Sequence, residues 1–252
     1  MSQIKAIGFD LFDTLIMVQN FALRRSIGIL TAKLWGAGIP VQEHEFAPLY
    51  VEAATKFVNE AKRTGQETHN SIWICAALGK LNISISPDDG RLNEAIEAYF
   101  TKFLTHARLV PKSIETLIQL KQNYKLGLLS NFTHAPAAKT FLANLNLSSL
   151  FDAIVVSGEL GYRKPHPLTY DTLLDKLGVS AEEIIYVGDN LEDDIEGAEF
   201  QGISAIWMDH DLLKGEEPSY RIFTKNTAGE KKGVRRAKNW DELISLIRVM
   251  DN

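Results

Sequence analysis

The segment IKAIGFDLFDTL, residues 4–15, opens with an apolar run and ends in an acidic turn. Its first part, 4–9, lacks the apolar/polar alternation of a half-exposed strand, so it predicts a strand buried on both faces. Similar runs follow at 126–129, 153–156, 184–187 and 204–208. Helical patterns separate these runs, at 114–121, 141–145, 173–177 and 195–198, and a last helix is predicted from about Asp241. Alternating strands and helices predict an α/β fold with a doubly wound, Rossmann-like parallel sheet.

Residues 16–105 interrupt this alternation, because they contain no strand-like run. They offer amphipathic helices at 21–35, 43–62, 70–81 and 88–103 instead. The sequence therefore predicts an inserted all-helical domain at 16–105 and an α/β core formed by 1–15 and 106–252. The aromatic residues of the insertion follow helical spacing and are expected to pack inside it: Phe21, Trp35, Phe46, Tyr50, Phe57 and Trp73.

The composition excludes several classes of protein. Apolar residues make up 45% and charged residues 23%, as in ordinary globular domains. The formal charge of −5 gives no extended basic surface, so nucleic acid is not an expected partner. A basic cluster in the polar segment 211–234 is expected to be a solvated loop: Lys231, Lys232, Arg235 and Arg236. No segment approaches the ~20 apolar residues of a membrane span, and no secretory leader pattern is present, so a cytoplasmic location is expected. The choice between monomer and homodimer stays open.

Polar residues follow the predicted strands where each strand ends. Asp10 follows the first, Ser130 and Asn131 the second, Lys164 comes shortly after the third, and Asp189 follows the fourth together with Asp193 and Asp194. Ligands collect at the carboxyl ends of parallel strands. Carboxylates with a backbone carbonyl suit a hard cation such as Mg²⁺, whereas a hydroxyl, an amide N–H and a lysine suit a phosphoryl group.

Four short motifs in this order resemble those of the haloacid dehalogenase (HAD) superfamily. They are FDLFDTL at 9–15, LLSN at 128–131, Lys164-Pro165 with Pro167, and VGDNLEDD at 187–194. The helical insertion directly after the first motif is similar to the helical cap of that superfamily. The resemblance covers nearly the whole chain and implies a hydrolase with a nucleophilic aspartate.

The resemblance also implies a metal site. Asp10 would bind Mg²⁺ through one carboxylate oxygen, and the backbone carbonyl of Phe12 and the carboxylate of Asp189 would complete the protein's direct ligands. Asp194 would orient Asp189, a water molecule or Lys164 from behind these ligands.

The implied catalytic and substrate-binding groups lie on the same strand ends. Asp10 would attack phosphorus and form an aspartyl-phosphate. Ser130 and the amide of Asn131 would donate hydrogen bonds to phosphoryl oxygens, and Lys164 would neutralise charge on the nucleophile and on the transferring group.

Phe12 departs from the pattern of the superfamily's phosphatases, which carry an aspartate at this position as general acid and base. Its absence is expected to cost roughly 10²- to 10⁴-fold in rate unless another group supplies the proton. Asp13, His134 and His166 are the alternative donors that the sequence offers.

The leading hypothesis is a Mg²⁺-dependent phosphatase acting on a small phosphorylated metabolite. One alternative is a phosphate-binding protein with lost or weak turnover, which Phe12 would explain. Another is a metal-free 2-haloacid dehalogenase-like hydrolase, although such a site has no reason to place Asp189 beside Asp10. Carbon–phosphorus cleavage would need a lysine from the insertion, for which Lys33, Lys56 and Lys62 are the choices.

Overall fold

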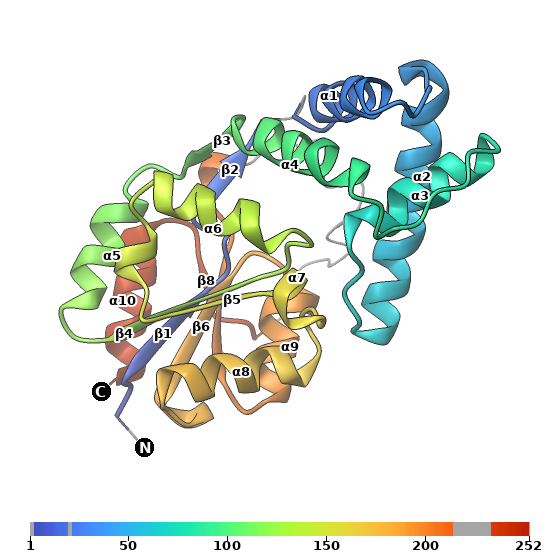
Figure 1. Ribbon diagram of the computed structural model, residues 1–252. Helices are drawn as coiled ribbons and strands as arrows, with labels where there is room; N and C mark the ends of the chain where they lie inside the picture. The colour runs from blue at the N-terminus through green and yellow to red at the C-terminus, as the bar shows by residue number, and fades with distance from the viewer. Residues whose placement is uncertain (1–2, 20–21, 214–232, 252) are drawn as a thin grey trace.

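A six-stranded parallel sheet with helices on both faces forms the centre of the protein (Figure 1). The computed structural model describes residues 3–19, 22–213 and 233–251. The strands lie in the order β5-β4-β1-β6-β7-β8. Their bounds are β1 Ala6–Phe9, β4 Lys125–Ser130, β5 Ala153–Val156, β6 Ile184–Gly188, β7 Ser204–Met208 and β8 Arg236–Ala237. The predicted α/β, doubly wound fold class is confirmed, and the strand that precedes Asp10 lies in the middle of the sheet.

Successive residues of the central strands pack into two different apolar cores. On β6, Ile185 and Val187 belong to the core shared with α5 (Ser113–Lys121), α6 (Ala135–Asn144) and α10 (Trp240–Asp251). Ile184 and Tyr186 belong to the core on the opposite face, shared with α8 (Pro167–Leu177) and α9 (Gly197–Phe200). Because side chains alternate between the faces of a strand, a strand covered on both faces needs an apolar residue at every position.

Four helices occupy residues 22–104 and lie to one side of the sheet and its covering helices (Figure 1). They are α1 Ala22–Gly36, α2 Glu43–Thr64, α3 Asn70–Lys80 and α4 Arg91–Leu104. We call them the four-helix segment. The chain enters it through β2 (Ile16–Val18) and leaves it through β3 (Ala107–Leu109), which pair antiparallel. The expectation of no strand within 16–105 is therefore wrong at β2, which is too short to show a periodic pattern.

The polar turn after β6 folds into a π-helix, η3 (Leu191–Glu196), rather than starting the helix predicted at 195–198. The side chain of Asn190 caps it by accepting hydrogen bonds from the N–H groups of Glu192 and Asp193. π-helical turns are rare and occur frequently at functional sites. Shorter elements are α7 Ser157–Leu160, η1 Ser148–Leu150, η2 Ala181–Glu183 and η4 Asp211–Leu213.

Parts of two sequence predictions lie outside the described residues, namely Phe21 and the basic residues Lys231 and Lys232. Of the same basic cluster, Arg236 pairs with Asp209 and lies 4.7 Å over the ring of Trp207. None of the helices in the described part of the chain combines the length and hydropathy of a membrane span.

Candidate active site

Asp10 is the first residue after β1 and lies at the carboxyl edge of the sheet. Its N–H donates to the carbonyl of Val187 on β6 at 2.9 Å, which ties it to the neighbouring strand. The chain then turns sharply, because the N–H groups of Leu15 and Ile16 both donate to the carbonyl of Leu11. Asp10 is 6% exposed and lines a cleft. The turn thus holds a nearly buried carboxylate at the base of a cavity.

Three carboxylates meet at this point. One oxygen each from Asp10, Asp189 and Asp194 lies within 4.8 Å of the others. Gly188 allows β6 and η3 to approach closely, since a Cβ atom there would lie 2.3 Å from Cγ of Asp194. Asp194 is fixed in turn by the N–H of Asn190, which donates to its Oδ2 at 2.9 Å. The structure therefore brings together three carboxylates that the sequence predicted at strand ends.

Lys164 joins this cluster from the loop between α7 and α8. Its Nζ lies 2.6 Å from Oδ1 of Asp10, 2.6 Å from Oδ1 of Asp194 and 3.0 Å from the hydroxyl of Tyr186. Only 1% of Lys164 is exposed. Burial alone would lower the pKa of Lys164, but the carboxylates Asp10 and Asp194 raise it above its ordinary value, so the ammonium stays charged.

The donor set suits a divalent cation. Burial raises the pKa of Asp10 to about 7, with Asp194 adding to the rise and Lys164 opposing it. The three carboxylates outnumber the one ammonium, which pairs with Asp10 and Asp194, and a divalent ion would balance the excess negative charge. Asp10 and Asp189 are the ligands expected from the sequence, and Asp194 is also within reach of the same point.

Ser130 is the last residue of β4, which lies beside β1, and Asn131 follows it; of the two, only Asn131 lines the cleft. The Asn131 side chain accepts a hydrogen bond from the N–H of Lys164 at 2.7 Å and donates to its carbonyl at 3.1 Å. It therefore positions the lysine loop as well as facing the cavity. Ser130 is fully buried, and its Oγ has no hydrogen-bond partner among the described residues.

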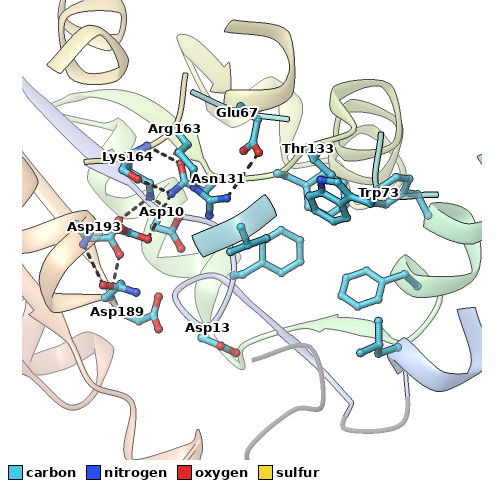
Figure 2. Close-up of a pocket in the computed structure, with 18 of the residues that line it drawn as sticks. Asp10, Asp13, Glu67, Trp73, Asn131, Thr133, Arg163, Lys164, Asp189 and Asp193 are labelled. Atoms are coloured by element: carbon cyan, nitrogen blue, oxygen red, sulfur yellow. Dashed lines mark hydrogen bonds and ion pairs between the residues drawn. The ribbon is translucent and has the colours of Figure 1, made fainter. Parts of the chain in front are cut away.

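The cleft has a volume of about 1070 Å³, part of it open to solvent. Figure 2 shows its two ends: Asp10, Asp189, Asp193 and Lys164 lie at one end, and Trp73 and Thr133 lie at the other. Six aromatic side chains line the cleft: Phe12, Trp73, Tyr99, Phe100, Phe103 and Phe132. The cavity is charged where the strands end and largely apolar where the four-helix segment meets the core.

Phe12 also lines the cleft and packs against two of its other rings. Its ring stacks on Phe132 with centroids 5.2 Å apart and lies 6.4 Å from the ring of Phe103. Asp13, a proton donor considered from the sequence, also lines the cleft and is 4% exposed, with a φ of 58°.

The other proton donors and lysines considered from the sequence lie elsewhere. His134 bonds to Glu97 and His69, and His166 packs on Tyr162; neither histidine lines the cleft. The three lysines considered for carbon–phosphorus cleavage do not line it either: Lys33, Lys56 and Lys62.

Residues 4–202 match the family of haloacid dehalogenase-like hydrolases. The chain belongs to this family. A glyceraldehyde 3-phosphate phosphatase of Methanothermobacter thermautotrophicus is 28% identical over 84% of the chain and 89% of the relative. A phosphoglycolate phosphatase of Yersinia pestis is 26% identical over 84% of each chain. Among solved structures, a 2-haloacid dehalogenase of Pseudomonas syringae pv. Tomato superposes with a TM-score of 0.69 at 22% identity, covering 98% of this chain and 99% of the other.

Several residues of this hydrolase's cleft were not predicted from the sequence as site residues. The side chain of Glu67, from the connection between α2 and α3, is buried, and its Oε1 lies 3.6 Å from Nη1 of Arg163. Arg163 directly precedes Lys164, a position that could have drawn attention to it. Trp73 packs in the apolar core, as expected from the sequence, and also lines the cleft. Trp35 was expected to pack inside the helical domain but is 54% exposed. Helical spacing cannot distinguish a packed face from a face that covers a cavity.

Proposed function

We propose that the protein is a Mg²⁺-dependent phosphatase that hydrolyses a small phosphorylated metabolite through an aspartyl-phosphate at Asp10. The grouping of Asp10, Asp189 and Asp194 within 4.8 Å carries this proposal. A metal-free dehalogenase would gain nothing from two further carboxylates beside its nucleophile, because like charges oppose ionisation of each other. The similarity to phosphatases of Methanothermobacter thermautotrophicus and Yersinia pestis supports the same activity.

The metal would be held by the carboxylates of Asp10 and Asp189 and by the backbone carbonyl of Phe12. When bound, Mg²⁺ supplies charge neutralisation and orientation for the phosphoryl oxygens. Asp194 is a positioning residue in this proposal, since it holds Lys164 and the N–H of Asn190.

The chain's own groups then act on the ester. A carboxylate oxygen of Asp10 attacks phosphorus, and Lys164, already 2.6 Å from that carboxylate, neutralises charge that develops on the phosphoryl group. We assign the amide of Asn131 and the Oγ of Ser130 to phosphoryl oxygens. Support for Ser130 comes from its unpartnered hydroxyl, because a buried donor without a partner is unfavourable unless a ligand satisfies it.

We further propose that residues 16–105 act as a cap domain over a core formed by 1–15 and 106–252. The connection between α2 and α3 contacts the core through hydrogen bonds from the N–H of Arg163 to Gly65 and from the N–H of Glu67 to Gly161. A cap in this position would exclude water from the phosphoryl transfer and select the substrate. The cytoplasmic location expected from the sequence stays a prediction.

Hydrolysis of a panel of phosphate monoesters, with and without Mg²⁺, tests the proposal. We expect phosphate release that requires Mg²⁺ and is abolished in Asp10→Asn. The matched control is Asp171→Asn, an exposed aspartate on α8 outside the cleft, which should retain activity. Phosphate release that is unaffected by Asp10→Asn, or that persists in a chelator, would reject the mechanism.

Phe12 favours a second candidate, a phosphate-binding protein with little turnover. Calorimetry would then detect Mg²⁺-dependent binding of inorganic phosphate, while no monoester is hydrolysed. Halide release from 2-haloacids in the presence of a chelator would instead indicate dehalogenation.

A further inference from the structure

We propose that the cleft selects phosphate monoesters with a flat apolar organic group, that is, aryl phosphates. This inference rests on the proposed phosphatase function and specifies its substrate class. It is carried by the apolar wall of the cleft, whose side chains are rings and aliphatic groups contributed by both the core and the four-helix segment.

The rings of this wall are arranged as a surface for stacking. Phe12 and Phe132 from the core are stacked, with an interplanar angle of 21°. Phe100 from α4 meets Phe132 edge-on at 5.2 Å, and Phe103 of the same helix lies beside Phe12. Aromatic ligands gain from offset-stacked and edge-to-face contacts of this kind, in addition to the burial of apolar area.

The polar side chains of Thr133, Trp73 and Glu67, which line the cleft away from Asp10 and Lys164, are already engaged within the protein. Thr133 Oγ1 donates to the carbonyl of Thr68, and Trp73 Nε1 donates to Thr68 Oγ1 at 2.8 Å. Glu67 accepts hydrogen bonds from the hydroxyl of Ser157 at 2.7 Å and from the N–H of Thr68 at 3.0 Å. A substrate with several hydroxyl groups would have to bury them against groups that are already satisfied, which is unfavourable.

The remaining polar groups mark where the phosphoryl group binds. Asn131 and Arg163 lie with Asp10 and Lys164 at the charged end of the cleft, whereas Trp73 lies at the other end (Figure 2). A bound ester would therefore have its phosphoryl group at Asp10 and its organic group among the rings, with Phe12 beside the oxygen that leaves.

The chemistry of the leaving group agrees with this orientation. In the first step a bond forms between Asp10 and phosphorus, the bond from phosphorus to the aryl oxygen breaks, and its electron pair departs with a phenolate. Phenols have pKa values of about 10, as in tyrosine, so the phenolate leaves without a proton from the enzyme and is protonated by water afterwards. In the second step water attacks phosphorus, a proton passes to solvent, and the bond to Asp10 breaks, which releases phosphate and restores the carboxylate. The ring of Phe12 cannot donate a proton, which hinders an alkoxide far more than a phenolate.

Calorimetry that measures the binding of two phosphonates to the Mg²⁺-loaded protein tests the inference independently of turnover. Phenylphosphonate and methylphosphonate share the charged group and differ by the ring. We expect phenylphosphonate to bind about 10- to 100-fold more tightly, as burial of a phenyl ring implies. Phe103→Leu should remove most of this preference. Phe141→Leu, a buried phenylalanine on α6 that does not line the cleft, should keep it and serves as the matched control. Circular dichroism verifies that each variant is folded, and Phe132→Leu replaces Phe103→Leu if that variant unfolds.

Turnover separates failure of this inference from failure of the proposed function. We expect kcat/KM for phenyl phosphate to exceed that for glycerol 3-phosphate by tenfold or more. The reason is that departure of the alkyl oxygen depends on a general acid, which the site lacks. Efficient hydrolysis of glycerol 3-phosphate with poor hydrolysis of phenyl phosphate would overturn the inference and leave the phosphatase intact. If no ester is hydrolysed, the phosphatase proposal fails, and equal binding of the two phosphonates would overturn the aryl preference as well.

Discussion

Replacing Phe12 by aspartate places a carboxyl group beside the site where the ester bond breaks. The change removes a half-buried ring that stacks on Phe132 at 5.2 Å. Removal of the ring should lower the free energy of unfolding by about 1–2 kcal/mol for the lost apolar burial and by about 0.5–1.5 kcal/mol for the lost aromatic pair. For a chain of this size, such a loss should lower Tm by roughly 3–14 °C. In return, a general acid in reach of the leaving oxygen should raise kcat for glycerol 3-phosphate by about 10²-fold or more. The increase for 4-nitrophenyl phosphate should be small, because its leaving group needs no proton.

The measurement is steady-state kinetics of the wild type and of Phe12→Asp with both esters, alongside thermal unfolding. Phe12→Asn is the matched control, since it loses the same ring and has nearly the same shape but cannot donate a proton. An identical response of the two variants to glycerol 3-phosphate would refute the reasoning that only a proton donor is absent. An equal increase for both esters would also refute it, because acid catalysis depends on the leaving group.

Three further perturbations test the carboxylate cluster and the contact between the four-helix segment and the core. Lys164→Met leaves the buried carboxylates of Asp10 and Asp194 without their cation, so urea unfolding at pH 8 without Mg²⁺ should show a loss of about 3–5 kcal/mol; an unchanged midpoint would contradict the ion-pair geometry. Gly188→Ala forces a Cβ atom to within 2.3 Å of Asp194 Cγ, so Mg²⁺ affinity measured by calorimetry should fall, and unchanged affinity would show that the two elements separate freely. Burial lowers the pKa of His69 below its ordinary value, so the unfolded chain binds the proton first. Stability should therefore fall as pH drops below about 6.5 and stay constant above it with respect to this group. The loss of Tm between pH 7 and pH 5 should be smaller in His69→Gln, and equal losses would exclude this histidine.

The fold was predictable where burial acts on every residue of an element. The strands at 126–129, 153–156, 184–187 and 204–208 were located to within about one residue, because a strand between two layers of helices needs a continuous apolar run. β2, β3 and β8 were not predicted. They have only two or three residues each, and backbone pairing rather than an apolar pattern defines them.

The candidate site was predictable to the extent that topology determines it. Asp10, Lys164 and Asp189 meet because parallel strands bring their carboxyl ends to one edge, and β1 lies between β4 and β6. Glu67 reaches the cleft only through packing of the four-helix segment on the core. Nothing in its sequence neighbourhood distinguishes it from an exposed glutamate.

Phe12 connects the catalytic and the binding halves of the cleft, and this connection limits how either half can change. Its backbone follows the nucleophile, while its ring belongs to the wall formed with Phe132 and Phe103. A carboxyl group at this position would supply a proton but would also place a polar group in the stacked surface, where desolvation opposes its charge. The aromatic wall and the absence of a general acid therefore depend on each other. The rings select aryl esters, whose oxygen leaves without a proton, and a site without a general acid hydrolyses only such esters efficiently. A change at Phe12 alone would alter both properties at once, whereas a change at Phe103 alone should alter only the preference for the organic group.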